Sequence, residues 1–424
     1  MSHFSKVLKN RDFFLLWTGQ IISQLGDRLT QMALLGLVYQ RAPGSAVEIA
    51  KVLAFTIFPV FLVGPIAGAY VDRWDRRKVM YVCDFLRAGL VVLIPLFLLT
   101  KGFIWIYLII FLSFSIGRFF VPAKLSILPE LVDKKSLLTA NSLINTTGMI
   151  AAVLGFGISG LIVELMGAKS GFYLDALSFL ISATSIFLIS SRSKREANVE
   201  DLKSLGRDLV QGIQKSVLTD IKEGVLYFVR HREIRFIAAI IFLLWSALGS
   251  VYVISIVFVQ NTLHSATKDL GFLIVFLGLG LFLGSMAYGA VGHKLSQFKI
   301  IFYSLILSGF MLAIFAFVLN AYPVFACAAA LALLLGLSVS PIMIASNTII
   351  HKVSDNAMMG KIFSSLEIVI HLGFLIFMFA SGFLANHIPQ SAILVCIGIL
   401  IAITGALSLL FGRYYEWIGG GKQV

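Results

Sequence analysis

The stretch GAYVDRWDRRKVM, residues 68–80, places six charged side chains in the seven positions from Asp72 to Lys78, directly after a long apolar run. Charged residues make up only 13% of the chain, so a cluster of four cations and two anions needs an explanation. Cations alone would suffice to hold a loop on one side of a membrane. The two aspartates therefore predict ion pairs that form and break.

The composition is that of a membrane protein. Of the 424 residues, 59% are hydrophobic, and the mean hydropathy is +0.95. A helix needs about 20 mostly apolar residues to cross a bilayer, whereas barrel strands are about ten residues long and alternate in polarity. Twelve apolar runs have the length of a helix, so we expect an all-α membrane protein with twelve spans. They are residues 13–39, 47–71, 79–99, 103–121, 137–163, 170–191, 236–261, 269–292, 299–319, 323–346, 362–385 and 390–412.

Basic residues divide unequally between the two sides of this topology. If the N-terminus is cytoplasmic, the inside segments hold 26 Lys and Arg and the outside segments hold five. Cytoplasmic loops carry such an excess, so we expect both termini in the cytoplasm and the chain in a bacterial inner membrane. This distribution accounts for the net charge of +13 without nucleic acid as a partner.

The polar segment 192–235 divides the chain into halves of six spans each, 1–191 and 236–424. Its end, Asp220 to Arg235, has the periodicity of an amphipathic helix on the cytoplasmic surface of the membrane. A shift of 221 residues lays GAYVDRWDRRK (68–78) over GAVGHKLSQFK (289–299). Two similar six-helix bundles in parallel are expected of a secondary transporter.

The charged cluster resembles motif A of the major facilitator superfamily, G-x-x-x-D-R-x-x-R-R/K. Gly68, Asp72, Arg73, Arg76 and Arg77 carry the motif, and Asp75 stands where the family usually has Gly. The resemblance implies a cytoplasmic gate in this loop, to which we also assign Asp75 and the neighbouring Asp84 and Arg87. These last two are three residues apart on one helix and can pair locally.

Further segments are similar to the branch of macrolide-efflux and enterobactin-exporter proteins. They are GQIISQLGD (19–27), FFVPAKLSILPELV (119–132), LLTANSLIN (137–145), YLDALSFLISA (173–183) and EGVLYFVRHREIR (223–235). The PAKLSIL segment (122–128) is also similar to lysophospholipid transporters of the same superfamily.

The first span carries a polar stripe. Gln20, Gln24, Asp27 and Gln31 follow the spacing i, i+4, i+7 and i+11, which places them on one helix face. Because an ionisable group inside a bilayer costs at least ~2.5 kcal/mol, such groups are functional candidates. We expect the stripe to line a substrate cavity and Asp27 to gain and lose the coupling proton. The alternative is a structural ion pair with Arg28 or with another buried cation. Arg28 is poorly placed for this because adjacent residues project about 100° apart.

Other polar residues inside spans are weaker candidates. Arg118 resembles the arginine of the family's motif B, associated with proton coupling, although a structural role is equally compatible with its sequence. Glu367 and His371, spaced i, i+4, suit a hydrogen-bonded pair or a second protonation site better than a metal site, which needs more ligands. Asn145 is assigned to the substrate cavity, and Asp175 has a structural interpretation.

Together these features predict a secondary transporter that exports an amphipathic or hydrophobic small molecule, drug-like or siderophore-like, by proton-coupled alternating access. A lysophospholipid flippase and a divalent metal exporter are the alternatives. No nucleotide-binding or enzyme motif occurs, so neither catalysis nor a cofactor or resident metal is expected. The expected partners are substrate, protons and the bilayer, with a monomer as the working unit.

Overall fold

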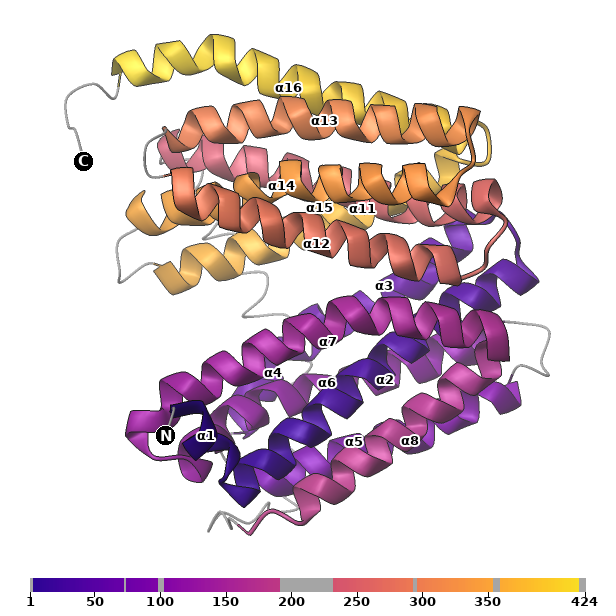
Figure 1. Ribbon diagram of the computed structural model, residues 1–424, viewed down its shortest axis with the longest axis vertical. Coiled ribbons are helices and arrows are strands. Elements are labelled where there is room, and N and C mark those ends of the chain that lie inside the picture. The colour runs from indigo at the N-terminus through magenta and orange to yellow at the C-terminus, as the bar shows by residue number, and fades with distance from the viewer. Residues whose placement is uncertain are drawn as a thin grey trace. The chain divides into compact units, whose positions relative to one another are not determined.

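A computed structural model describes residues 3–71, 74–97, 103–190, 232–292, 296–353 and 359–418. In these ranges the chain is helical, without strands (Figure 1). The helices of the first part are α1 (His3–Leu8), α2 (Arg11–Arg41), α3 (Ala46–Leu62), α4 (Gly64–Val71), α5 (Arg76–Phe97), α6 (Ile104–Leu131), η1 (Lys134–Ser136), α7 (Leu137–Met166) and α8 (Ala168–Phe187). Those of the second are α11 (Arg232–Leu263), α12 (Lys268–Val291), α13 (Gln297–Ala321), α14 (Phe325–Val353), α15 (Met359–Leu384) and α16 (Gln390–Ile418).

The helices account for the twelve predicted spans. Among the described residues, nine helices are long and apolar enough to cross a membrane. The other three expected spans correspond to α2, to α3 with α4, and to α15. The span predicted at 47–71 is divided at Val63. Pro65 has no backbone N–H to continue the helix there.

The chain forms two compact units. Unit 1 comprises Met1–Arg41, Lys51–Leu218 and Ala266–Gly271, and unit 2 comprises Ala42–Ala50, Thr219–Ser265 and Phe272–Val424. In unit 1, α2 packs against α7 and α8, and α5 packs against α6 and α8. In unit 2, α13 packs against α14 and α16, and α11 packs against α15. The predicted linker 192–235 lies outside the described residues up to Arg232, so its amphipathic helix stays a prediction.

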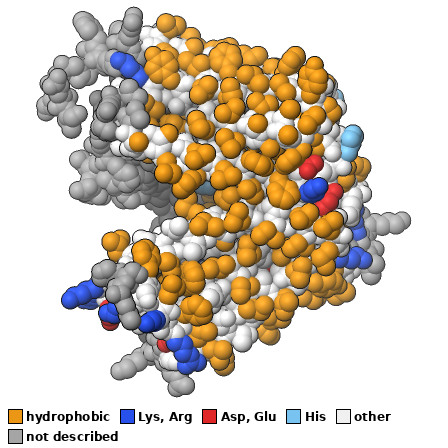
Figure 2. Space-filling view, in the orientation of Figure 1, with side chains coloured by type: hydrophobic (Ala, Val, Ile, Leu, Met, Phe, Trp, Pro, Cys, Tyr) orange, Lys and Arg blue, Asp and Glu red, His pale blue; other side chains and the backbone are white. Residues whose placement is uncertain are grey.

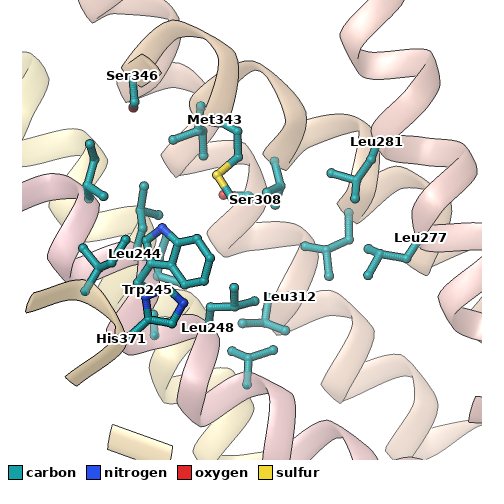
Figure 3. Close-up of a pocket in the computed structure, with 18 residues that line it drawn as sticks. Leu244, Trp245, Leu248, Leu277, Leu281, Ser308, Leu312, Met343, Ser346 and His371 are labelled. Atoms are coloured by element: carbon teal, nitrogen blue, oxygen red, sulfur yellow. The ribbon is translucent and has the colours of Figure 1, made fainter. Parts of the chain in front are cut away.

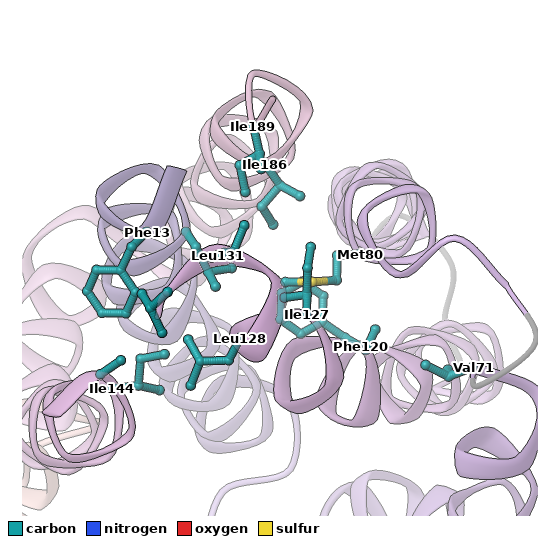
Figure 4. Packing of buried hydrophobic residues seen from close by; sticks show 14 of the residues in the cluster. Phe13, Val71, Met80, Phe120, Ile127, Leu128, Leu131, Ile144, Ile186 and Ile189 are labelled. Carbon is teal, nitrogen blue, oxygen red and sulfur yellow. The ribbon is translucent and has the colours of Figure 1, made fainter. Parts of the chain in front are cut away.

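A hydrophobic cluster joins the helices of unit 1 near the start of α2 and the end of α6 (Figure 4). Phe13 of α2 is fully buried and shares this cluster with Met80 of α5, Ile127 of α6 and Ile186 of α8. Burying one such side chain contributes roughly 1.5–3 kcal/mol relative to leaving it in water. The cluster thereby fixes the relative positions of the helices that carry the polar groups of this unit.

Small residues bring helices of unit 2 into close contact. Gly309 of α13 faces Gly398 of α16, and a Cβ atom on either residue would overlap the carbonyl oxygen of the other. Gly280 of α12 lies in the same way against Leu333 of α14. Such contacts are typical of helix pairs in membranes, where side chains of the size of Leu would keep the backbones apart.

Large apolar side chains cover the outside of the helices. On the face shown in Figure 2, hydrophobic side chains lie along the helices and charged ones gather toward their ends. Phe85, Leu165 and Phe317 are more than 60% exposed. This surface is suited to hydrocarbon, as expected for a chain that spans a bilayer.

Candidate functional site

An ion pair between α2 and α5 lies inside unit 1. The Nη2 atom of Arg87 donates a hydrogen bond to Oδ1 of Asp27 at 2.6 Å. The Arg87 side chain is 9% exposed, and that of Asp27 is 27% exposed. The guanidinium also lies over the Phe179 ring, 4.1 Å from its centroid. A cation at this distance gains from the negative face of the ring.

This arrangement corrects the expected local pair of Asp84 and Arg87. Arg87 extends to Asp27 on another helix, while Asp84, one turn earlier on α5, is fully buried. Gly117 of α6 lies beside the guanidinium, and a Cβ atom there would be in ordinary van der Waals contact with Cζ of Arg87, at 3.5 Å. The spacing correctly placed Asp84 and Arg87 as neighbours on α5. The partner that Arg87 binds, Asp27 on α2, follows only from the packing of the helices.

A second buried carboxylate, Asp175 of α8, has its own hydrogen bonds. Thr30 of α2 donates to Oδ2 of Asp175, and the Ser178 hydroxyl donates to Oδ1 at 3.1 Å. Gly26 of α2 lies so close that an added Cβ atom would overlap both Asp175 and Ser178. Asp175 therefore joins α2 to α8, in agreement with the structural role expected for it.

The polar stripe on α2 contacts several neighbours. Gln20 is buried. Gln24 faces α7, where its Oε1 atom lies 3.0 Å from the place of a Cβ atom on Gly148. Gln31 accepts a hydrogen bond of 2.8 Å from Nη1 of Arg28. Only Asp27 of the stripe joins the ion pair, so the four residues have different surroundings despite their common helix face.

The remaining candidates of unit 1 are not hydrogen-bonded to this pair among the described residues. Arg118 of α6 is partly buried, and its Nε atom has no hydrogen bond within the described part of the chain. It lies next to Gly117, which contacts Arg87. Asn145 lies on an exposed face of α7. Its assignment to the substrate cavity therefore stays a prediction.

The charged cluster at the start of α5 is partly described. Asp75 accepts a hydrogen bond of 3.0 Å from the backbone N–H of Lys78, so it caps the N-terminus of α5. Arg76 pairs with Glu130 of α6 and donates to the carbonyl of Ser126 at 3.1 Å. Arg77 donates to the Ile189 carbonyl beyond the end of α8. The partners of Arg76 and Arg77, on α6 and beyond the end of α8, were not identified from the sequence.

Part of this charged cluster lies outside the residues that the structure describes. Asp72 and Arg73 are not among the described residues, and nothing is described of the surroundings of Gly68 within α4. Oδ1 of Asp75 caps α5, and whether Asp75 also pairs with Arg73 lies outside the described residues. The gate assigned to Gly68, Asp72 and Arg73 stays a prediction.

Unit 2 encloses a cavity of about 780 Å³ among its helices (Figure 3). It is lined from α11 to α16 by aliphatic side chains and Met343, with Trp245, Ser308, Ser346 and His371 as its aromatic and polar members. The rings of Trp245 and His371 lie 5.4 Å apart and are tilted by 38°. No Asp, Glu, Lys or Arg is found among the described residues that line it.

His371 belongs to this lining, whereas the side chain of Glu367 lies outside the described residues. The expected proton site formed by these two residues is therefore untested. Within the described ranges, no three His, Cys, Asp or Glu side chains lie close enough together to hold a metal ion. Trp245 was not predicted as part of the site, since one aromatic residue in an apolar run carries no signal of its own.

Comparison with known proteins gives a consistent result. The family model of the Major Facilitator Superfamily matches residues 16–325. YkuC of Bacillus subtilis, an uncharacterized MFS-type transporter, is 24% identical over 84% of this chain and 81% of its own. Multidrug efflux pump Tap of Mycolicibacterium fortuitum is 23% identical over 96% of this chain and 97% of its own. Macrolide efflux protein A of Streptococcus pyogenes is 21% identical over 71% and 72% of the two chains.

Solved structures have the same fold. A POT family transporter in complex with 5-aminolevulinic acid aligns over 96% of both chains with a TM-score of 0.68 and 14% identity. An inward-facing bacterial homologue of the iron transporter ferroportin aligns over 94% of this chain and 98% of its own, with a TM-score of 0.67 and 14% identity. At such identity these likenesses concern the fold alone.

Proposed function

This chain is a member of the Major Facilitator Superfamily, a transporter rather than an enzyme, and we propose that it exports an amphipathic or hydrophobic small molecule by alternating access, driven by protons. Relatives named for macrolide and multidrug efflux favour a drug-like substrate. The apolar cavity of unit 2 is the observation that carries the proposed substrate class.

The lining of the cavity favours a bulky, mostly apolar ligand. Its volume of about 780 Å³ lies within the range of small-molecule sites, which are mainly apolar with a few polar groups. The aromatic face of Trp245 can hold an apolar ring or a cation. The buried Ser346 hydroxyl has no hydrogen-bond partner within the described region, so it can bond a polar group of the ligand. A strongly anionic substrate finds no basic residue among the described lining.

Asp27 is the proposed coupling site. It is the acid of the α2 stripe that pairs with a buried cation, and its side chain is still 27% exposed. A carboxylate with both a cationic partner and contact with solvent can receive a proton when that partner moves away. Arg118, Glu367 and His371 are proposed as secondary coupling residues. Asp27 is also proposed to contact the substrate path in unit 1, together with Gln20, Gln24, Gln31 and Asn145.

The remaining parts of the proposal concern topology and gating. The 26 to 5 distribution of basic residues supports cytoplasmic termini, an inner-membrane location and a division into halves 1–191 and 236–424 joined by the linker. The charged cluster of residues 68–77, together with Asp84 and Arg87, is proposed as the cytoplasmic gate. Substrate and protons are the working partners of a monomer.

Transport by purified protein in liposomes with an imposed pH gradient tests this function. The panel is a macrolide, a lipophilic cation, a siderophore, a lysophospholipid and a divalent metal ion. Gradient-dependent flux of a macrolide, lipophilic cation or siderophore is expected. Flux of only the lysolipid would favour the flippase, and flux of only the metal ion would contradict the proposed substrate class.

Replacement of Trp245 tests the cavity itself. We expect Trp245→Ala to weaken binding of the transported compound about 2- to 12-fold, from the ~0.5–1.5 kcal/mol of an aromatic contact. Trp245→Phe should restore most of this affinity. Phe282→Ala is the matched control, because Phe282 lies on α12 with 61% exposure and outside the lining. Equal affinity in all four proteins would place the substrate elsewhere.

A further inference from the structure

Two acidic side chains flank Arg87, and only one of them is hydrogen-bonded to it. Asp27 accepts its bond of 2.6 Å from Nη2. Asp84 is fully buried one turn before Arg87 on α5, and within the described ranges no hydrogen bond reaches either of its carboxylate oxygens. The Nε atom of Arg87 also has no hydrogen bond within the described ranges. Arg87 therefore has an unused donor, and Asp84 has unused acceptors.

The spacing on α5 places Asp84 within reach of Arg87. Side chains three residues apart on a helix are neighbours, so a change of Arg87 rotamer can exchange Asp27 for Asp84. The hydroxyl of Ser182 on α8 lies near enough to interact with the Asp84 carboxylate, but no hydrogen bond of standard geometry joins the two among the described residues. The carboxylate of Asp84 is therefore less well hydrogen-bonded than that of Asp175, which accepts from Thr30 and Ser178.

Other charged or titratable groups surround this trio. They are Asp175 on α8, Arg118 and Lys124 on α6, and Cys83 on α5. None of them donates a hydrogen bond to Asp84 within the described structure. A buried carboxylate without such a bond is unfavourable, whereas a carboxylic acid avoids the cost of a buried charge.

We propose that Arg87 exchanges between Asp27 and Asp84 in each transport cycle, and that Asp84 is a second proton-carrying residue. The proposed cycle starts with Asp27 as the carboxylate paired with Arg87 and with Asp84 as a neutral acid. A proton from outside binds Asp27 and forms its O–H bond. Arg87 then turns to Asp84, whose O–H bond breaks, and this second proton leaves to the cytoplasm. On the return, the O–H bond of Asp27 breaks, its proton forms the O–H bond of Asp84, and Arg87 pairs with Asp27 again, so one proton crosses in each cycle.

The step conserves charge inside the membrane. Before and after the exchange, the trio contains one cation, one carboxylate and one carboxylic acid, so its net charge is zero. Asp84 lies eight residues from the first residue of α5, Arg76, which is about 12 Å along the helix. That end of α5 adjoins the loop 72–78, which we expect in the cytoplasm. The proton of Asp84 therefore has a shorter path to the cytoplasm than to the outside. This proposal rests on proton-driven transport, the proposed function.

Infrared spectroscopy of the purified full-length protein tests the exchange without needing the substrate. The C=O stretch of a protonated carboxyl group is the readout, and the component missing from Asp84→Asn is assigned to Asp84. We expect this component in the wild type and its loss in Asp27→Asn, because a neutral residue 27 sends Arg87 to Asp84, which then ionises. Asp175→Asn, which alters another buried acid, should keep it.

The outcomes separate this proposal from the proposed function. Absence of an Asp84 component in the wild type, or its persistence in Asp27→Asn, would overturn the exchange. Asp84→Asn should fold normally, since it replaces a neutral side chain, and an unfolded variant would also contradict the proposal. In liposomes it should lose gradient-driven flux but keep exchange of substrate across the membrane. A wild type without gradient-driven flux, yet with the expected spectra, would refute proton-driven export alone.

Discussion

Asp27→Asn removes the charge that pairs with Arg87 but keeps the size and one oxygen of the side chain. Because an amide cannot titrate, we expect gradient-driven transport to be abolished. Asp27→Glu still titrates and should keep partial activity with a shifted pH optimum. Substrate affinity should be retained in both variants, since the residues that line the cavity of unit 2 are unchanged.

The energetic cost follows from the geometry of the pair. Removing one partner of a fully buried ion pair costs roughly 3–5 kcal/mol. Asp27 is 27% exposed, and an amide oxygen can still accept from Arg87, so the loss should be nearer to that of one charge-assisted hydrogen bond, about 1.5–3 kcal/mol. An exchange of Arg87 to Asp84 would reduce it further. The variant should therefore fold, with lower thermal stability in detergent.

Three measurements on the wild type, Asp27→Asn and Asp27→Glu distinguish coupling from a structural role. They are stability in detergent, substrate affinity and flux driven by a pH gradient. A structural Asp27 predicts that stability, yield and binding fall together. Full gradient-driven flux in well-folded Asp27→Asn would refute the reasoning and direct the search to Glu367.

Three other predictions concern topology, gating and packing. Reporters after Lys203 and at the C-terminus should report cytoplasm and one near Arg41 the outside, and a periplasmic signal after Lys203 would contradict the six-plus-six division. Asp72→Asn should change the ratio of outward-open to inward-open protein about 5- to 150-fold, which corresponds to ~1–3 kcal/mol of lost stabilisation. Cysteine accessibility from both sides measures this ratio. An unchanged ratio with normal activity would mean that the loop only sets the topology. Gly26→Ala should lower the free energy of unfolding by ~1–3 kcal/mol, because the new methyl group overlaps the hydroxyl and the carboxylate that Gly26 faces on α8. Gly89 has open space around it, so Gly89→Ala should be nearly neutral in thermal unfolding. Equal stability of the two variants would refute the packing argument.

The helical class and the membrane location are determined by the sequence. Hydrophobic runs of about 20 residues are a local property, because each span satisfies its own backbone hydrogen bonds. The charged stretch at 68–78 and the match in the second half gave the superfamily for the same reason, since they are contiguous in the chain. The span 47–71 was predicted as one helix, and its division at Val63 was not foreseen, although Pro65 is a local signal for such a break.

The partners of the charged residues were decided by the tertiary structure. Spacing on α5 allowed Asp84 and Arg87 to pair, but Arg87 reaches Asp27, which is 60 residues away in the chain. Arg76 in the same way finds Glu130 on α6. Helix periodicity states which face a residue occupies, while the helix that lies against that face depends on the packing of all six spans. The sequence by itself therefore determined that Asp27 is an acid within a span, on a polar helix face, and only the packing of α2, α5 and α8 determined which cation it meets.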